Sequence, residues 1–162
     1  MEALRNKDKF TIAYKINKFN RFYKLFFSYI KSQEILKQNP DVLIINGTYK
    51  TNEYKIPLID IIGITNINTN FFIAFAFVQN KDEEAYTWVL NYLKTLYSTH
   101  ELPLPIVVRT DRELALINSL ETVFSTIKYI LCSWYIKKVI VVFCRPYFRG
   151  RNEDDWLAFI NK

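Results

Sequence analysis

The chain has few of the residues that interrupt or cross-link protein chains. Its 162 residues include three glycines, five prolines, two cysteines and a single histidine. So few glycines and prolines argue against a linker-rich or disordered protein. Two cysteines, Cys132 and Cys144, do not make a disulfide framework, so a reduced intracellular setting is the default. Without a histidine pair to complete four ligands, they also argue against a structural zinc site.

Long hydrophobic runs are missing as well. The longest, Ile136 to Cys144, is interrupted by Lys137 and Lys138 and is too short to span a bilayer. The N-terminus is charged from Arg5 onward and has no uninterrupted apolar segment, so no secretory signal is readable. These absences predict an intracellular protein with no membrane partner.

What the chain does have is hydrophobic material and an uneven distribution of charge. Half of the residues are hydrophobic and 17% are aromatic, which is ample for the core of one domain. The net charge is +6, and residues 1–38 account for it because they hold nine basic and three acidic residues. The candidate phosphate contacts in this part are Lys15, Lys18, Arg21 and Lys24. A solvated helix face is the plainer interpretation of the same charges.

Residues 10–37 are predicted to form a helix. Apolar residues recur there at spacings of three or four, with lysines between them: Ile12, Ile16, Phe19, Phe22, Tyr23, Phe26 and Ile30. Asn39-Pro40 ends the pattern. We therefore expect a basic, aromatic-rich helical segment over residues 1–39 and a main domain over residues 40–162.

The main domain is predicted to alternate strands and helices. Strands are expected at 42–45, 56–64, 71–78, 106–108 and 128–131, and helices open at Asp82 and Arg112. The resulting order, β-β-β-α-β-α-β, predicts an α/β fold in which a mixed sheet is flanked by helices. That is the arrangement of ribonuclease H-like folds.

Two polar residues mark the ends of strands that lie side by side in such a fold. Asn46 follows the first strand, and Asp111 follows the fourth. Two-metal phosphoryl-transfer sites place carboxylates at such positions. Asp111 is thus a candidate catalytic residue and metal ligand, with Asn46 as an amide in the first acidic position. The alternatives are a helix N-cap for Asp111 and a turn residue before Gly47 for Asn46.

Four segments carry a family resemblance over roughly residues 40–160. In order they are Asn46-Gly47-Thr48-Tyr49-Lys50-Thr51-Asn52 with Tyr54, Pro57 and Leu58; Glu84, Tyr86, Trp88 and Leu90; Thr110-Asp111-Arg112-Glu113 with Ala115 and Leu116; and Leu131-Cys132-Ser133-Trp134-Tyr135. Together they resemble the transposase domain of Mutator-like transposable elements (MULE), which also underlies transposase-derived transcription factors.

The resemblance implies an Asp, Asp, Glu triad that holds two divalent metals, usually Mg²⁺ or Mn²⁺, and catalyses DNA strand cleavage and transfer. It further implies DNA element ends as the partner, a nuclear location and a possible homo-oligomer. Hard oxygen ligands with negative charge suit this chemistry because Mg²⁺ favours octahedral oxygen coordination.

Three departures weaken this expectation for the present chain. The first acid is replaced by Asn46, the histidine of the last motif is replaced by Tyr135, and the third acid is missing before Lys162. Glu153 and Asp154 lie too early to replace it. We therefore expect a degenerate, truncated transposase domain that is inactive and binds metal poorly through Asp111. The alternatives are a non-catalytic DNA-binding or regulatory domain, and a nuclease completed by another chain.

Overall fold

The computed structural model describes residues 9–48, 53, 56–150 and 153–160. It divides into two compact units, residues 1–130 and 131–162. None of the helices in the described part of the chain combines the length and the hydrophobicity needed to cross a bilayer.

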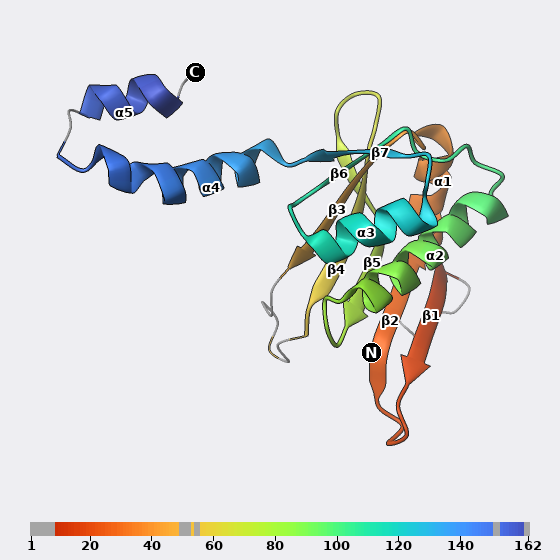
Figure 1. The fold of residues 1–162 in the computed structure, drawn as a ribbon. Coiled ribbons are helices and arrows are strands. Elements are labelled where there is room, and N and C mark those ends of the chain that lie inside the picture. Colours follow the sequence, from red (N-terminus) through yellow and green to blue (C-terminus); the bar gives the residue numbers. More distant parts are fainter. Residues whose placement is uncertain (1–8, 49–52, 54–55, 151–152, 161–162) are drawn as a thin grey trace. The chain divides into compact units, whose positions relative to one another are not determined.

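Seven strands form one mixed sheet in the order β1-β2-β5-β4-β3-β6-β7 (Figure 1). Their bounds are β1 Phe10–Ile16, β2 Phe22–Tyr29, β3 Val42–Thr48, β4 Leu58–Ile64, β5 Asn70–Val78, β6 Val107–Thr110 and β7 Lys128–Leu131. Neighbours from β1 to β3 pair antiparallel, whereas β3 and β6 pair parallel. The predicted α/β class with a mixed sheet is confirmed, and the strands predicted after residue 40 are present.

The predicted N-terminal helix over residues 10–37 is wrong for most of its length. β1 and β2 form an antiparallel hairpin there, and only Ile30–Gln38 is helical, as α1. The turn explains the difference, because Asn20 has a φ of 58° and the Asn17 side chain accepts hydrogen bonds from two backbone amides. β2 also pairs with β5, so the hairpin belongs to the same sheet as the main domain.

The core of the first unit lies between the sheet and three helices, α1, α2 (Glu83–Thr99) and α3 (Leu114–Val123). Figure 1 shows α2 and α3 crossing one face of the sheet. Fully buried strand residues such as Leu43 and Ile59 join Leu90 and Leu93 of α2 and Leu116 of α3 in one cluster. Alternation along the strands supplies this apolar face.

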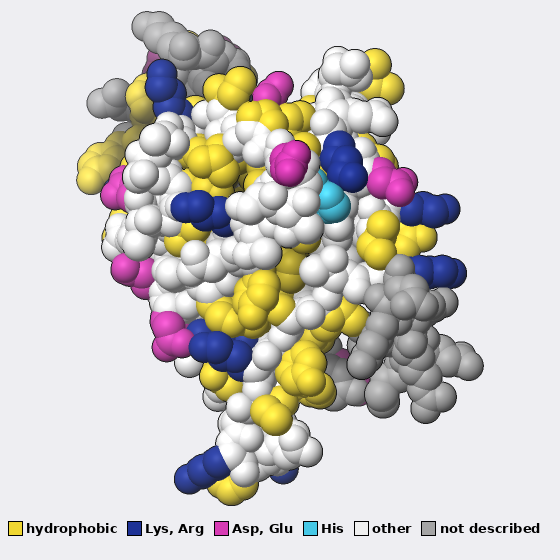
Figure 2. Space-filling view, turned by 90° about the vertical axis from the view of Figure 1, so that its right-hand side faces the viewer, with side chains coloured by type: hydrophobic (Ala, Val, Ile, Leu, Met, Phe, Trp, Pro, Cys, Tyr) yellow, Lys and Arg dark blue, Asp and Glu magenta, His cyan; other side chains and the backbone are white. Residues whose placement is uncertain are grey.

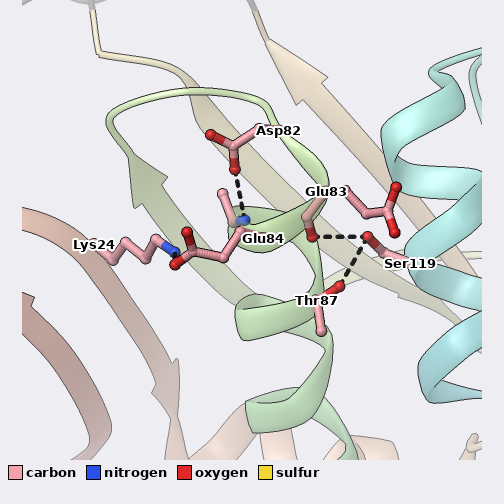
Figure 3. A network of polar contacts seen from close by, with 7 residues as sticks. Lys24, Asp82, Glu83, Glu84, Thr87 and Ser119 are labelled. Atoms are coloured by element: carbon pink, nitrogen blue, oxygen red, sulfur yellow. Dashed lines mark hydrogen bonds and ion pairs between the residues drawn. The ribbon is translucent and has the colours of Figure 1, made fainter.

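The N-terminus of α2 is fixed by a network of polar contacts (Figure 3). The helix begins where the sequence predicts, and Asp82 caps it by accepting a 2.8 Å hydrogen bond from the Ala85 amide. From α3, the Ser119 hydroxyl donates to the Glu83 carbonyl and accepts from Thr87. These bonds hold the first turn of α2 against α3.

The second unit consists of short helices. α4 spans Ser133–Cys144, a 3₁₀ helix (η3) spans Arg145–Phe148, and α5 spans Glu153–Ile160. Phe148 contacts the rings of Trp156 and Phe159, which gives this unit a small aromatic cluster. Cys132 and Cys144 both lie in this unit and are half-buried.

Candidate functional site

Asn46 and Asp111 come from neighbouring parallel strands. Ile45 of β3 is aligned with Thr110 of β6. The next residue along the chain is Asn46, still inside β3, in one case and Asp111, directly after β6, in the other, at the same end of the sheet. The fold thus brings together two candidate residues that are far apart in the sequence. We call this end of β3 and β6, with the side chains around it, the strand-end site.

The Asp111 carboxyl group is partly withdrawn from solvent. Its Oδ1 atom is buried and has no hydrogen-bond partner in the described part of the chain. Burial raises the pKa of Asp111, the positive charge of Lys81 opposes that rise, and Glu113 adds to it. The N-cap of α3 is Glu113, without a side-chain capping bond, so the interpretation of Asp111 as the helix cap is wrong.

Lys81 is the central cation of the strand-end site. Its Nζ donates a 3.0 Å hydrogen bond to the Gly47 carbonyl and lies 2.5 Å from Oε2 of Glu113. The lysine side chain is 5% exposed, and that of Glu113 is 19% exposed. One ammonium group therefore links β3, the start of α3 and the connection that leads into α2.

Gly47 allows this approach because it has no side chain. A Cβ atom at position 47 would lie 2.6 Å from the Tyr86 hydroxyl oxygen and 2.7 Å from Cε of Lys81. Carbon atoms that are not bonded do not come so close, so any side chain there would displace one of these neighbours. The glycine after Asn46 thus serves close packing.

Asp60 is a third polar residue beside this site and is not among the residues predicted from the sequence. It lies on β4 directly opposite Asn46, so the two side chains share one face of the sheet. Burial raises the pKa of Asp60. A signal was available, because Asp60 is the one charged residue within the apolar run of β4.

We expect Asp60→Asn to stabilise the protein at neutral pH. A carboxyl group whose pKa is raised by folding favours the folded state below its unfolded pKa and opposes it as the pH rises through the folded pKa. Removing the charge should therefore raise Tm by about 1–3 °C at pH 7.

The gain should disappear in thermal unfolding followed by circular dichroism below about pH 3, where the wild-type carboxyl group is protonated in both states. A gain of the same size at both pH values would contradict a role for burial of the charge.

The donor set of the strand-end site does not fit a pair of divalent metals. Such a pair needs several anionic oxygen ligands. Here Asn46 supplies an amide, and Lys81 places a positive charge where it acts on Asp111. Among the described residues, no three His, Cys, Asp or Glu side chains are grouped so that they could hold a metal ion.

The basic residues expected to contact phosphate separate into two environments. Lys15, Lys18 and Arg21 are exposed near the turn of the β1–β2 hairpin, which is the projecting end at the bottom of Figure 2, where basic and hydrophobic side chains gather. Lys24 is instead buried, with Nζ 2.6 Å from Oε1 of Glu84 on α2 (Figure 3). The hairpin rather than a helix thus presents the three exposed cations.

The remaining motif residues and candidate acids fall either outside the described residues or in the second unit. Tyr49 to Asn52 and Tyr54 fall outside the described residues. Cys132 precedes α4 in the second unit, with Tyr135 exposed inside that helix. Asp154 is exposed on α5, and Glu153 begins that helix.

Comparison with known proteins identifies one family. The model of a family described as the MULE transposase domain matches residues 42–139. Protein FAR1-RELATED SEQUENCE 5 of Arabidopsis thaliana is 24% identical over 98 residues, which are 60% of this chain and 12% of that protein.

Two further relatives are similarly distant. A protein described as PKS-NRPS hybrid synthetase cheA, from Chaetomium globosum, is 25% identical over 71% of this chain and 2% of its own length. Protein FAR1-RELATED SEQUENCE 2 of Arabidopsis thaliana is 25% identical over 71% of this chain and 14% of its own length. The chain therefore spans only a small part of the curated relatives it matches.

Proposed function

The chain belongs to the MULE transposase domain family, and we propose that it is a transposase-derived protein that no longer cleaves DNA. The observation that carries this proposal is the amide of Asn46 beside Asp111 at the ends of β3 and β6. Asparagine keeps one acceptor oxygen but lacks the negative charge that would face a metal ion. Because electrostatic stabilisation is usually the largest catalytic contribution, that loss removes most of the rate.

The strand order supports a ribonuclease H-like core within this proposal. β3, β4 and β5 are consecutive antiparallel strands, and β6 adds to the other side of β3 in parallel. The crossover from β5 to β6 contains α2, and the next one, from β6 to β7, contains α3. This strand order supports the proposal that a ribonuclease H-like fold places Asn46 and Asp111 at the same end of the sheet.

A plasmid-relaxation assay tests the loss of cleavage. We expect the unaltered protein to leave supercoiled DNA intact in Mg²⁺ or Mn²⁺, at any concentration of either ion that keeps the protein folded. We expect Asn46→Asp to remain inactive as well, because Lys81 still occupies the strand-end site. Metal-dependent nicking that co-purifies with the unaltered protein would overturn the proposal.

DNA binding without cleavage is the second part of the proposed function, and the hairpin favours it. The exposed cations Lys15, Lys18 and Arg21 lie within nine residues that also present the exposed aromatic rings of Tyr14, Phe19 and Phe22. Cations that neutralise phosphates bind DNA in a salt-dependent way, and exposed rings stack on bases. We propose DNA as the partner and, with it, a nuclear location.

A further inference from the structure

Within the described part of the chain, Lys24 and Lys81 have buried side chains and form short ion pairs with glutamates, but their surroundings differ. Lys24 pairs with Glu84, whose side chain is 78% exposed. Lys81 pairs with Glu113, whose side chain is 19% exposed, and also binds the Gly47 carbonyl. A solvent-exposed partner is screened by water, whereas a half-buried group of charges must be neutralised locally.

We propose that the Lys81 ammonium group is the resident cation of the strand-end site and excludes a divalent metal from it. This inference deepens the proposed loss of cleavage, because it names the group that stands where metal binding would be needed. Lys81 contacts the glutamate and the carbonyl directly, and its charge acts on Asp111. A divalent ion would have to displace an ammonium that is already neutralised and buried.

The packing around the lysine supports this role. Cε of Lys81 would lie 2.7 Å from a Cβ at position 47, so the lysine stem runs directly across Gly47. The lysine stem and Tyr86 therefore fill the space on the helix-facing side of β3, which Gly47 shares with the buried Ile45, whereas Asn46 is on the other face. A metal ion on the helix-facing side, near Asp111 and Glu113, would meet both a like charge and occupied volume.

Removing the lysine charge should turn the same residues into a cation site. In Lys81→Met, the carboxylates of Asp111 and Glu113 and the Gly47 carbonyl remain, without the ammonium that neutralised them. Oxygen atoms with negative charge are the ligands that Mn²⁺ and Mg²⁺ prefer. Methionine retains much of the apolar stem, so the substitution removes charge with little change in volume.

The test is a Mn²⁺ titration in which free Mn²⁺ is counted by electron paramagnetic resonance. We expect Lys81→Met to bind one Mn²⁺ at least about tenfold more tightly than the unaltered protein. Lys24→Met is the matched control, because it also removes a buried lysine paired with a glutamate. It should bind no more Mn²⁺ than the unaltered protein, since Glu84 lies in solvent.

A second variant, Lys81→Gln, provides the same test if Lys81→Met does not fold. Lys81→Gln keeps a donor for the Gly47 carbonyl. Adding Glu113→Gln to either Lys81 variant should abolish the gained Mn²⁺ site.

We also expect Mn²⁺ to raise the Tm of the single Lys81 variants and to leave the Tm of Lys24→Met unchanged. Tight Mn²⁺ binding by the unaltered protein, or no gain in either folded Lys81 variant, would overturn the inference. Neither result would by itself restore DNA cleavage, so the two proposals fail separately.

Discussion

Replacing Phe26 by alanine lowers the free energy of unfolding by about 3–5 kcal/mol, the usual cost of emptying a buried phenylalanine site. Phe26 is fully buried on the helix-facing side of β2, where its ring stacks on Tyr92 of α2. Urea unfolding followed by tryptophan fluorescence would measure the loss. Phe26 also joins the hairpin to the core, so removal of its ring weakens the attachment of β2 to α2.

Phe22→Ala is the matched control for this prediction. Phe22 is 64% exposed and contacts Tyr14 edge-on, so its removal should cost less than about 1 kcal/mol. In a continuous helix over residues 10–37, Phe22 and Phe26 would share one stripe and both would be buried. Equal losses for the two variants would therefore contradict the hairpin.

Neutralising Lys18 and Arg21 together weakens DNA binding by between about tenfold and about a hundredfold near 0.1 M salt. Both side chains are exposed at the hairpin turn, with Lys18 Nζ 5.1 Å from the centre of the Phe19 ring. Each lost phosphate contact also reduces the slope of log K against log salt by about 0.9. Fluorescence anisotropy of a labelled duplex at several salt concentrations would measure both effects.

The matched control removes two other exposed lysines. Lys31 and Lys37 lie on α1, away from the hairpin turn, and the double substitution to serine changes the net charge equally. It should lower the affinity far less than Lys18→Ser with Arg21→Ser. Lys24→Met should also have little effect, because Glu84 already pairs with that lysine. Equal losses for all pairs would indicate a nonspecific effect of net charge.

The sequence predicts most of the fold after residue 40. The apolar runs ending at Ile45 and Val108 become β3 and β6, and the acidic start at Asp82 caps α2. These elements are predictable because their patterns are local: an uninterrupted buried strand, or a capped amphipathic helix. The position of Asn46 and Asp111 at the same end of β3 and β6, one residue beyond the aligned Ile45 and Thr110, then follows from the expected strand order.

The N-terminal hairpin was missed because its residues satisfy two periods at once. Phe22 and Phe26 are spaced like a helical stripe, yet Phe10, Ile12 and Tyr14 alternate as in a strand. Asn17 and Asn20 were the turn signals that decide between them.

Two parts of the strand-end site depend on tertiary structure. Lys81 lies in a connection and meets Gly47 and Glu113 only after the sheet and α3 assemble. Asp60 becomes relevant through the register that places it opposite Asn46. Neither relation is encoded in a local pattern, so the sequence alone predicts only Asn46 and Asp111.

We propose that this MULE-family domain retains contact with DNA and has lost the metal site that cuts it. One measurement tests both parts: incubation of a labelled duplex with the unaltered protein and Mn²⁺, followed by native and denaturing electrophoresis of the same samples. The account predicts a retarded, salt-sensitive complex on the native gel and full-length strands on the denaturing gel. Shortened strands that depend on Mn²⁺, or no complex at low salt, would contradict it.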